Sequence, residues 1–274
     1  GSVFDVITGS VVLMNQHPHT YANQNVSSNK GNISISGSSA QDSTLTGSTV
    51  TNEAHNPGDM AMQSLASNVG TVNVNGTYAN VGPLHMLVSG KSEQTANVNS
   101  STVTNDVKGG GSVNNCGEVD CSKAAQGHQS LASNVGNVTV SGFSKQTAGV
   151  TGGSAVTNDA DGNGAKAAQN LASNYGNVGI SGISTQAASV DASVLSNKAS
   201  GTNAAALQNV ASNYGTVNVS GMSTQMAWIT GGTHVANLAK GTNSQAIQNL
   251  ASNDSCTPPP AFSCIGFSCR VASR

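Results

Sequence analysis

A phrase of about eighteen residues recurs along this chain, and its nearly constant spacing limits the possible folds more than any other feature. The clearest copy reads QNLASNYGNVGISGISTQ and runs from Gln169 to Gln186. The intervals between successive copies are 39, 66, 40, 39 and 40 residues. A fixed period of this size is typical of repeat proteins, in which each unit is stabilised by its neighbours. The copies begin at Gln24, Gln63, Gln129, Gln169, Gln208 and Gln248.

The scarcity of charge is the second constraint. Charged residues make up 8% of the 274 residues and the net charge is -2, whereas about a quarter of an ordinary domain is charged. The ten Lys and Arg residues are scattered, and binding of nucleic acid would require a basic stripe. Low charge together with many β-branched and amide side chains favours self-association through strands.

Each copy carries a stretch in which apolar and polar residues alternate, which is the period of a β-strand. Turn-forming Ser-Gly or Asn-Gly steps follow most of these stretches. The apolar positions are expected to form the strand core. They are Ile33, Ile35, Val72, Val74, Val138, Val140, Val178, Ile180, Val217 and Val219.

Two further pieces complete each unit. A phrase such as Ser48–Asn52 or Ser101–Asn105 is interpreted as a second short strand that ends at its Asn. An Ala-rich piece, exemplified by Asn203–Gln208, leads back to the main phrase. Helix propensity alone favours a helical turn there, but the neighbouring strands make a third strand the preferred interpretation.

The repeats define the domain organisation. Residues 1–22 are expected to form a separate N-terminal segment, residues 23–253 the β repeat array, and residues 254–274 a tail rich in Pro and Cys. The long interval indicates two insertions, near residues 77–87 and 107–122. Insertions in a repeat array map to loops on one face.

The cysteines indicate an oxidising compartment. Cys116 and Cys121 are five residues apart, as are Cys264 and Cys269, and Cys256 is left over. Zinc sites use closer pairs, so two local disulfides are the better interpretation. The start at Gly1 without Met indicates either a mature N-terminus whose leader was removed or an engineering scar. We therefore expect a secreted protein at the cell surface.

Stacking explains why the same residue types recur at the same positions. One unit has too few apolar side chains to offset its ordering entropy, but stacked copies place each strand about 4.8 Å from its equivalent. Asn and Gln at equal positions then form hydrogen-bonded ladders. We therefore predict an all-β fold, a stacked β-solenoid or cross-β array of about six units of roughly 40 residues. The expected ladder residues are the six Gln residues that begin the copies and Asn68, Asn134, Asn174 and Asn213.

The two ends of such a stack carry rows of backbone amides that natural monomers cap. No polar cap is visible in this sequence. Uncapped ends pair with another copy of the chain, which predicts a filament assembled end to end. The expected partner is therefore the chain itself, with no nucleic acid and no membrane span, since no apolar run approaches the roughly 20 residues that a spanning helix needs.

The phrase Ala172–Ile180 with Gln186 after it resembles the repeats of Fap-type functional amyloid subunits of bacterial biofilms. The Asn203–Gln208 phrase is more distantly similar to curli repeats. The resemblance covers roughly residues 23–253. It implies an extracellular cross-β fibre in a biofilm matrix, with other matrix components as further partners.

Other classes of function are less well supported. A β-solenoid adhesin or fibre-type binding module would use the inserted loops, Tyr78–Met86 and Cys116–Cys121. An ice-binding solenoid would need flat Thr arrays, which Ser193 and Ser196 interrupt. The six His residues are scattered and no catalytic arrangement recurs, so we expect neither an enzyme nor a cofactor. Calcium binding stays open at carboxylates expected to be solvated after the Thr-Asn step. They are Glu53, Asp106, Asp159 and Asp161.

Overall fold

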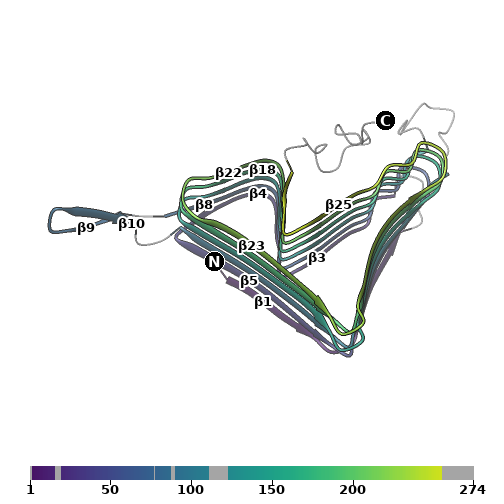
Figure 1. Ribbon diagram of the computed structural model, residues 1–274, viewed down its shortest axis with the longest axis horizontal. Helices are drawn as coiled ribbons and strands as arrows, with labels where there is room; N and C mark the ends of the chain where they lie inside the picture. Colours follow the sequence, from purple (N-terminus) through teal and green to yellow (C-terminus); the bar gives the residue numbers. More distant parts are fainter. Residues whose placement is uncertain (1, 16–19, 77, 88–89, 111–122, 255–274) are drawn as a thin grey trace.

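The protein is a β-solenoid. The computed structural model describes residues 2–15, 20–76, 78–87, 90–110 and 123–254, and all regular elements in these residues are β-strands. Four parallel sheets of six strands each run along the stack, and the chain visits all four sheets in every complete turn (Figure 1). The predicted fold class is confirmed. One repeat of about 40 residues forms one broad rung of four strands rather than two narrower coils.

Two of the sheets hold the first strands of the chain. Sheet A contains β1 (Ser2–Ile7), β5 (Ser38–Thr46), β11 (Lys91–Asn99), β15 (Phe143–Thr151), β19 (Ile183–Asp191) and β23 (Ser223–Thr230). Sheet B contains β2 (Ser10–Asn15), β6 (Thr49–His55), β12 (Thr102–Lys108), β16 (Ala155–Asp161), β20 (Val194–Ser200) and β24 (His234–Lys240).

The other two sheets hold the repeated phrase. Sheet C contains β3 (Asn23–Val26), β7 (Met62–Leu65), β13 (His128–Leu131), β17 (Ala168–Leu171), β21 (Leu207–Val210) and β25 (Ile247–Leu250). Sheet D contains β4 (Asn29–Ser36), β8 (Asn68–Asn75), β14 (Asn134–Val140), β18 (Asn174–Ile180), β22 (Asn213–Val219) and β26 (Asn253–Asp254). A complete rung therefore follows the order C, D, A, B.

The interior is built from columns of equivalent residues. Leu65, Leu131 and Leu171 are paired in register in sheet C and are fully buried. They belong to a long apolar cluster that also includes Val and Ala residues of sheets A and B. The strand-core residues of sheet D form a second cluster, in which the Val and Ile residues of β8, β14 and β18 are buried and those of β4 and β22 are partly buried. The register of the strands thus stacks equivalent residues of successive rungs directly on one another.

Sheets C and D meet at an inward notch of the cross-section (Figure 1). Tyr175 and Tyr214 stack there with ring centroids 5.5 Å apart, and burial raises the pKa of Tyr175 well above its usual value. The next position in each copy is Gly, and Gly176 has a φ of 112°. A Cβ on Gly176 would lie 2.8 Å from the carbonyl oxygen of Gly136 in the rung before. Only glycine therefore lets successive rungs approach here.

The 66-residue interval between Gln63 and Gln129 includes a segment that leaves the stack. An antiparallel hairpin of β9 (Tyr78–Val81) and β10 (Leu84–Leu87) leaves between β8 and β11 and projects from one corner (Figure 1). It coincides with the insertion predicted near residues 77–87. The second insertion lies largely outside the described residues, as do Cys116, Cys121, Cys256, Cys264 and Cys269.

Three local expectations need correction. The phrase Ser48–Asn52 does not end a strand at its Asn, because β6 continues to His55 and Asn52 faces the interior. The Ala-rich piece is not a strand, since β21 begins at Leu207 and Ala206 turns the corner with a φ of 46°. The stack also includes β1 and β2, ahead of the segment 23–253, because these strands pair with β5 and β6.

Candidate functional site: the polar columns and the two ends of the stack

A column of Gln side chains runs the length of sheet C. The Nε2 of Gln63 donates to the Oε1 of Gln24 at 2.8 Å, and each later Gln donates in the same way to the one before it, at 2.7–2.8 Å. The same nitrogen also donates to a main-chain carbonyl of sheet B, such as that of Thr157 for Gln129. All six Gln residues named from the sequence belong to this column.

A column of Asn side chains runs in the opposite sense along sheet D. The Nδ2 of Asn134 donates to the Oδ1 of Asn174 at 2.9 Å, and the other members bond their successors at 2.7–2.9 Å. Asn29 and Asn253 extend the four predicted members at the two ends. From sheet A, Gln146 also donates to Asn174 across the interior. Each buried Asn of this column is thus bonded along the stack and also across it to a side chain of sheet A.

Sequence reasoning missed a third column. In sheet B, inward-facing Asn residues bond one another at 2.8–2.9 Å, in the sense of Asn105 Nδ2 to Asn158 Oδ1. Their recurrence was visible, but placing them at strand ends hid their role. Leu13 takes the next position beyond Asn52, whose Oδ1 is buried without a partner. The column thus stops at the N-terminal end. Its members are Asn52, Asn105, Asn158, Asn197 and Asn237.

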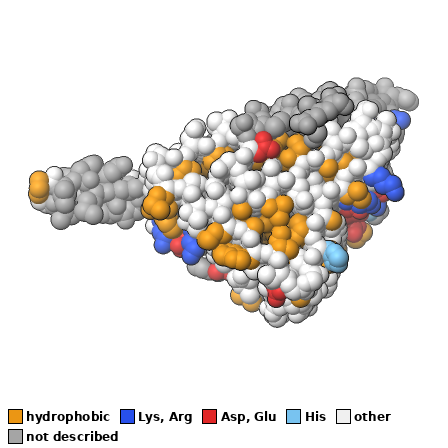
Figure 2. All heavy atoms as spheres, in the orientation of Figure 1, with side chains coloured by type: hydrophobic (Ala, Val, Ile, Leu, Met, Phe, Trp, Pro, Cys, Tyr) orange, Lys and Arg blue, Asp and Glu red, His pale blue; other side chains and the backbone are white. Residues whose placement is uncertain are grey.

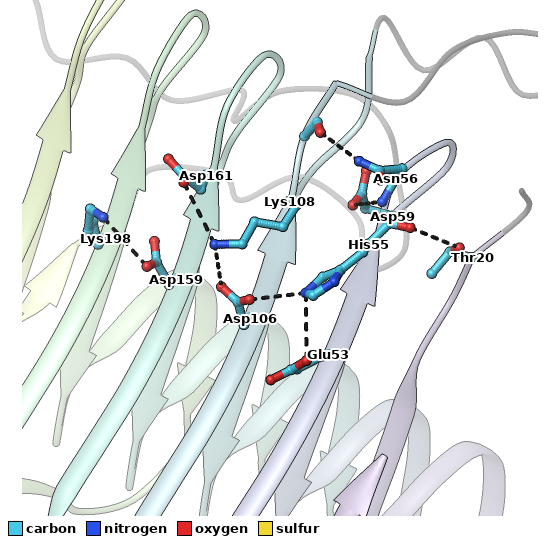
Figure 3. Close-up of polar contacts among 11 residues, drawn as sticks. Thr20, Glu53, His55, Asn56, Asp59, Asp106, Lys108, Asp159, Asp161 and Lys198 are labelled. Carbon is cyan, nitrogen blue, oxygen red and sulfur yellow. Dashed lines mark hydrogen bonds and ion pairs between the residues drawn. The ribbon is translucent and has the colours of Figure 1, made fainter. Parts of the chain in front are cut away.

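The outer face of sheet B carries alternating charges (Figure 3). His55 Nε2 lies 3.2 Å from Asp106, and Lys108 lies 3.7 Å from Asp106 and 3.8 Å from Asp161. Lys198 lies 3.5 Å from Asp159. These carboxylates were expected in turns after the Thr-Asn step, but they lie within strands. The cations are placed where they reduce repulsion between stacked carboxylates.

Two buried titratable groups lie near the corner between sheets B and C. Asp59 accepts a hydrogen bond from the main-chain N–H of Asn56 at 2.7 Å, while its other oxygen is buried without a partner. Burial raises the pKa of Asp59 to about 7. Burial lowers the pKa of His128 to about 4, and the charges of Lys166 and Lys30 add to this effect. Both groups therefore favour the neutral form in the fold.

A hollow at the corner of sheets D and A is lined by Thr139, Gly179 and Ser181 among others, without a titratable side chain. Within the described ranges, no group of three or more His, Cys, Asp or Glu residues is placed to hold a metal ion. The same residues include no helix that is long and apolar enough to cross a membrane.

The two ends of the stack are formed by the outermost strands of the four sheets. The described strands begin in sheets A and B with β1 and β2, and they end in sheets C and D with β25 and β26. At the second end, inward residues such as Val219 and Ala227 are only partly buried, and Leu250 is exposed. Figure 2 shows hydrophobic side chains interspersed with polar ones over the face that carries β23 and β25. Edges of this kind are templates for further strands.

Comparison with known proteins adds no relative. No family model, no curated protein and no solved structure matches this chain. The assignment of function therefore depends on the geometry described above.

Proposed function

We propose that this chain is the structural subunit of an extracellular filament, of functional-amyloid type, that assembles end to end through its sheet edges. The observation that carries the proposal is the pair of open ends. In the described residues, each of the four sheets ends on a strand that pairs on one side only, at both ends of the stack. Such heterologous, non-closing contacts generate open filaments.

The interior supports the same proposal. The Gln and Asn columns repeat at every rung and reach the outermost strands. A new rung with Gln and Asn at the same positions is therefore recognised by hydrogen bonds as well as by apolar contact. The resemblance to Fap-type repeats implies a location for such a filament, which is the matrix of a biofilm. Other matrix components are then further partners.

Electron microscopy and fibre diffraction of the purified full-length chain test the proposal. We expect unbranched filaments and a meridional reflection at about 4.8 Å, because the strands lie across the filament axis. Disulfide-reducing and oxidising conditions are compared in parallel, since five Cys residues are present. A chain that stays monomeric at high concentration under both conditions would contradict the proposal.

A second candidate is a β-solenoid adhesin, and the projecting β9–β10 hairpin favours it. Other rungs join sheets D and A by a short step, such as Ser141–Gly142 between β14 and β15. Replacing residues 76–90 by that step removes the hairpin while keeping the rung. Loss of attachment to cells or surfaces with unchanged filaments would assign binding to the hairpin.

A further inference from the structure

The two ends of the stack are complementary half rungs. A complete rung follows the order C, D, A, B, and the last described strands, β25 and β26, supply only C and D. The first strands, β1 and β2, supply only A and B, and each follows the register of the rung above it. One end therefore begins the rung that the other end completes.

The Gln column carries matching groups to both ends. The four inner Gln residues each donate to two partners, a main-chain carbonyl of sheet B and the side chain of the preceding Gln. Of these two kinds of partner, Gln24 donates only to a sheet B carbonyl, that of Thr51 at 3.0 Å. Gln248 donates only to the preceding Gln, Gln208. A second copy in register would place its Gln24 Nε2 at the Oε1 of Gln248. It would also place the carbonyl of its Val12 where the Nε2 of Gln248 reaches, because Val12 takes the position of Thr51.

The Asn and Ser columns of the corner between sheets C and D match in the same way. In the Asn column the donor points toward the C-terminal end, so Asn253 would donate to Asn29 of the next copy. A column of Ser residues runs along the same corner from Ser28 to Ser252. In it, the main-chain N–H of each Ser donates to the Oγ of the Ser in the preceding rung, as Ser252 does to Ser212 at 3.1 Å. The Oγ of Ser252 is buried without a partner. The N–H of Ser28 from the next copy would reach it.

Charge is complementary across the same junction. The stacked tyrosines at the notch belong to a column of six equivalent residues in sheet D. The four residues inside this column are apolar or aromatic, as with Val135 and Tyr175, and the residues at its two ends are Lys30 and Asp254. In register, Lys30 of one copy follows Asp254 of the preceding copy at about 4.8 Å along the sheet. Within its own chain, the Lys30 ammonium contacts the Tyr21 hydroxyl at 3.3 Å. Opposite charges at neighbouring positions favour this contact.

The outer faces of sheets A and B show the same distinction between inner and outer rungs. One column of sheet A has Thr44, Asn97, Gly149 and Ser189 inside the stack, with Val6 and Trp228 at its ends, 71% and 51% exposed. One column of sheet B has charged residues inside, with Met14 and Leu238 at its ends, 53% and 46% exposed. Apolar side chains thus occupy the ends of columns that are otherwise polar. The in-register junction brings Val6 onto Trp228 and Met14 onto Leu238.

We propose that successive copies of this chain join head to tail through a shared rung, in which β1 and β2 of one copy complete the rung begun by β25 and β26 of the copy before. Strands β3 and β4 then stack on β25 and β26. The proposal rests on the filament proposed above and specifies its junction. It requires a polar filament in which every contact between copies is the same.

Variants blocked at one end test this junction. Val6→Lys with Met14→Lys blocks the first end, and Trp228→Lys with Leu238→Lys blocks the second, because each pair would place two Lys side chains against apolar residues of the neighbouring copy. All four side chains are exposed in the single chain, so the fold should persist, which circular dichroism checks. The matched control is Ser189→Lys in the column of Trp228 but inside the stack. It should assemble like the unaltered chain.

Each blocked variant alone should remain monomeric, and an equimolar mixture of the two should form a 1:1 dimer that grows no further, measured by light scattering and analytical ultracentrifugation. Filaments from either blocked variant would overturn the shared rung while leaving the filament function intact. Dimers of one blocked variant by itself would indicate a head-to-head contact and overturn it also. If the unaltered chain forms no filament, the filament function itself is contradicted. This holds also when the reason is that another protein or residues 255–274 of the chain cover the ends.

Charge reversal and the axial repeat provide two independent readouts. Lys30→Glu or Asp254→Lys alone should raise the critical concentration about tenfold or more, since like charges then meet. The double variant should assemble by itself near the critical concentration of the unaltered chain, and its addition to ends of the unaltered chain should be weakened about tenfold or more, as in the single variants. A shared rung adds six strands to each sheet per copy, which predicts an axial repeat of about 29 Å at about 4.8 Å per strand. A repeat of about 34 Å, seven levels, would mean that the half rungs are not shared.

Discussion

The inner rungs and the outer rungs of this stack obey different rules. In the rung of β17 to β20, the column amides of Gln169, Asn174 and Asn197 are fully buried and bonded to the rungs on both sides. The outward positions of sheets A and B in this rung are polar or small, except for Ile183 and Val194 at the start of β19 and β20. In the outermost strands, the amides lack one neighbour and large apolar side chains such as Trp228 and Val6 face outward. The inner rungs are therefore stabilised by contacts between identical or similar residues of neighbouring rungs. The two ends of the stack instead carry different residues that complement one another.

The largest expected effect comes from an inner amide. Asn174→Leu removes the partner of Asn134, Asn213 and Gln146, all buried, so we expect a loss of at least about 3 kcal/mol in the free energy of unfolding, because each orphaned group costs about 1–3 kcal/mol. Asn253→Leu, its equivalent in the outermost strand, should cost about 1 kcal/mol. Urea unfolding of the dissociated chains measures both.

Equal losses for these two variants would contradict the distinction between inner and outer rungs. Asn253→Leu should instead weaken assembly, because Asn253 is placed to donate across the junction. The control for a general effect of Leu at a polar site is Asn218→Leu, on the outer face of the same sheet.

The next effect concerns the approach of neighbouring rungs. Gly176→Ala forces a residue with a side chain into a φ of 112° and places its Cβ 2.8 Å from the carbonyl oxygen of Gly136. We expect a loss of about 2–3 kcal/mol, since strain of this kind costs of order 1–3 kcal/mol. Gly179→Ala, three residues later, meets nothing within 4 Å and should be close to neutral. Thermal unfolding of the two variants, side by side, measures the difference.

Burial near the corner of sheets B and C predicts two opposite pH dependences. The pKa of His128 is lowered to about 4, so its contribution to stability is present above its ordinary value near 6.5 and is lost as the pH falls toward 4. The pKa of Asp59 is raised to about 7, so its contribution is present near pH 4 and is lost as the pH rises toward 7. Each changes stability by at most about 1.4 kcal/mol per pH unit.

His128→Gln should therefore flatten the loss of stability between pH 6.5 and 4, and Asp59→Asn should flatten the loss between pH 4 and 7. Asn keeps an oxygen that accepts from the main-chain N–H of Asn56. Denaturant midpoints measured at several pH values give both profiles. Parallel profiles for the two variants would show that these groups do not titrate as their burial indicates.

The smallest expected effect lies on the outer face of sheet B. Lys198 is separated by 3.5 Å from Asp159 and is partly exposed, so Lys198→Ala should change the free energy of unfolding by about 0–1 kcal/mol. The effect should decrease in 1 M salt, which screens exposed pairs. A larger, salt-independent loss would indicate packing of the Lys stem rather than the ion pair.

The columns of the repeated phrase could be predicted from the sequence because equal residues at a constant period indicate stacked neighbours. Gln129 and Gln169 are 40 residues apart and do bond one another. The projecting hairpin could be placed from the length of one interval alone. These inferences needed only the alignment of the chain with itself.

Other parts could not be predicted because strand pairing does not require identical side chains. Strands β1 and β2 share the register of β5 and β6, yet Leu13 replaces the Asn of the other rungs, so these strands have no repeat signature. The corners were also hidden, since Ala172 and Ala206 adopt a φ near 47°, a region that Ala seldom occupies. Surrounding rungs impose that conformation, and local propensity gives no indication of it.

The hairpin of β9 and β10 gives the proposed filament a spacing as well as a surface. Each copy contributes one such arm, so the arms recur once for every six rungs, about every 29 Å of length. A ligand that binds one arm weakly would be held by many arms at once when it is fixed to a surface, and linked sites of this kind increase avidity by a factor of about 100–10,000. The length of the polymer would then set the strength of attachment.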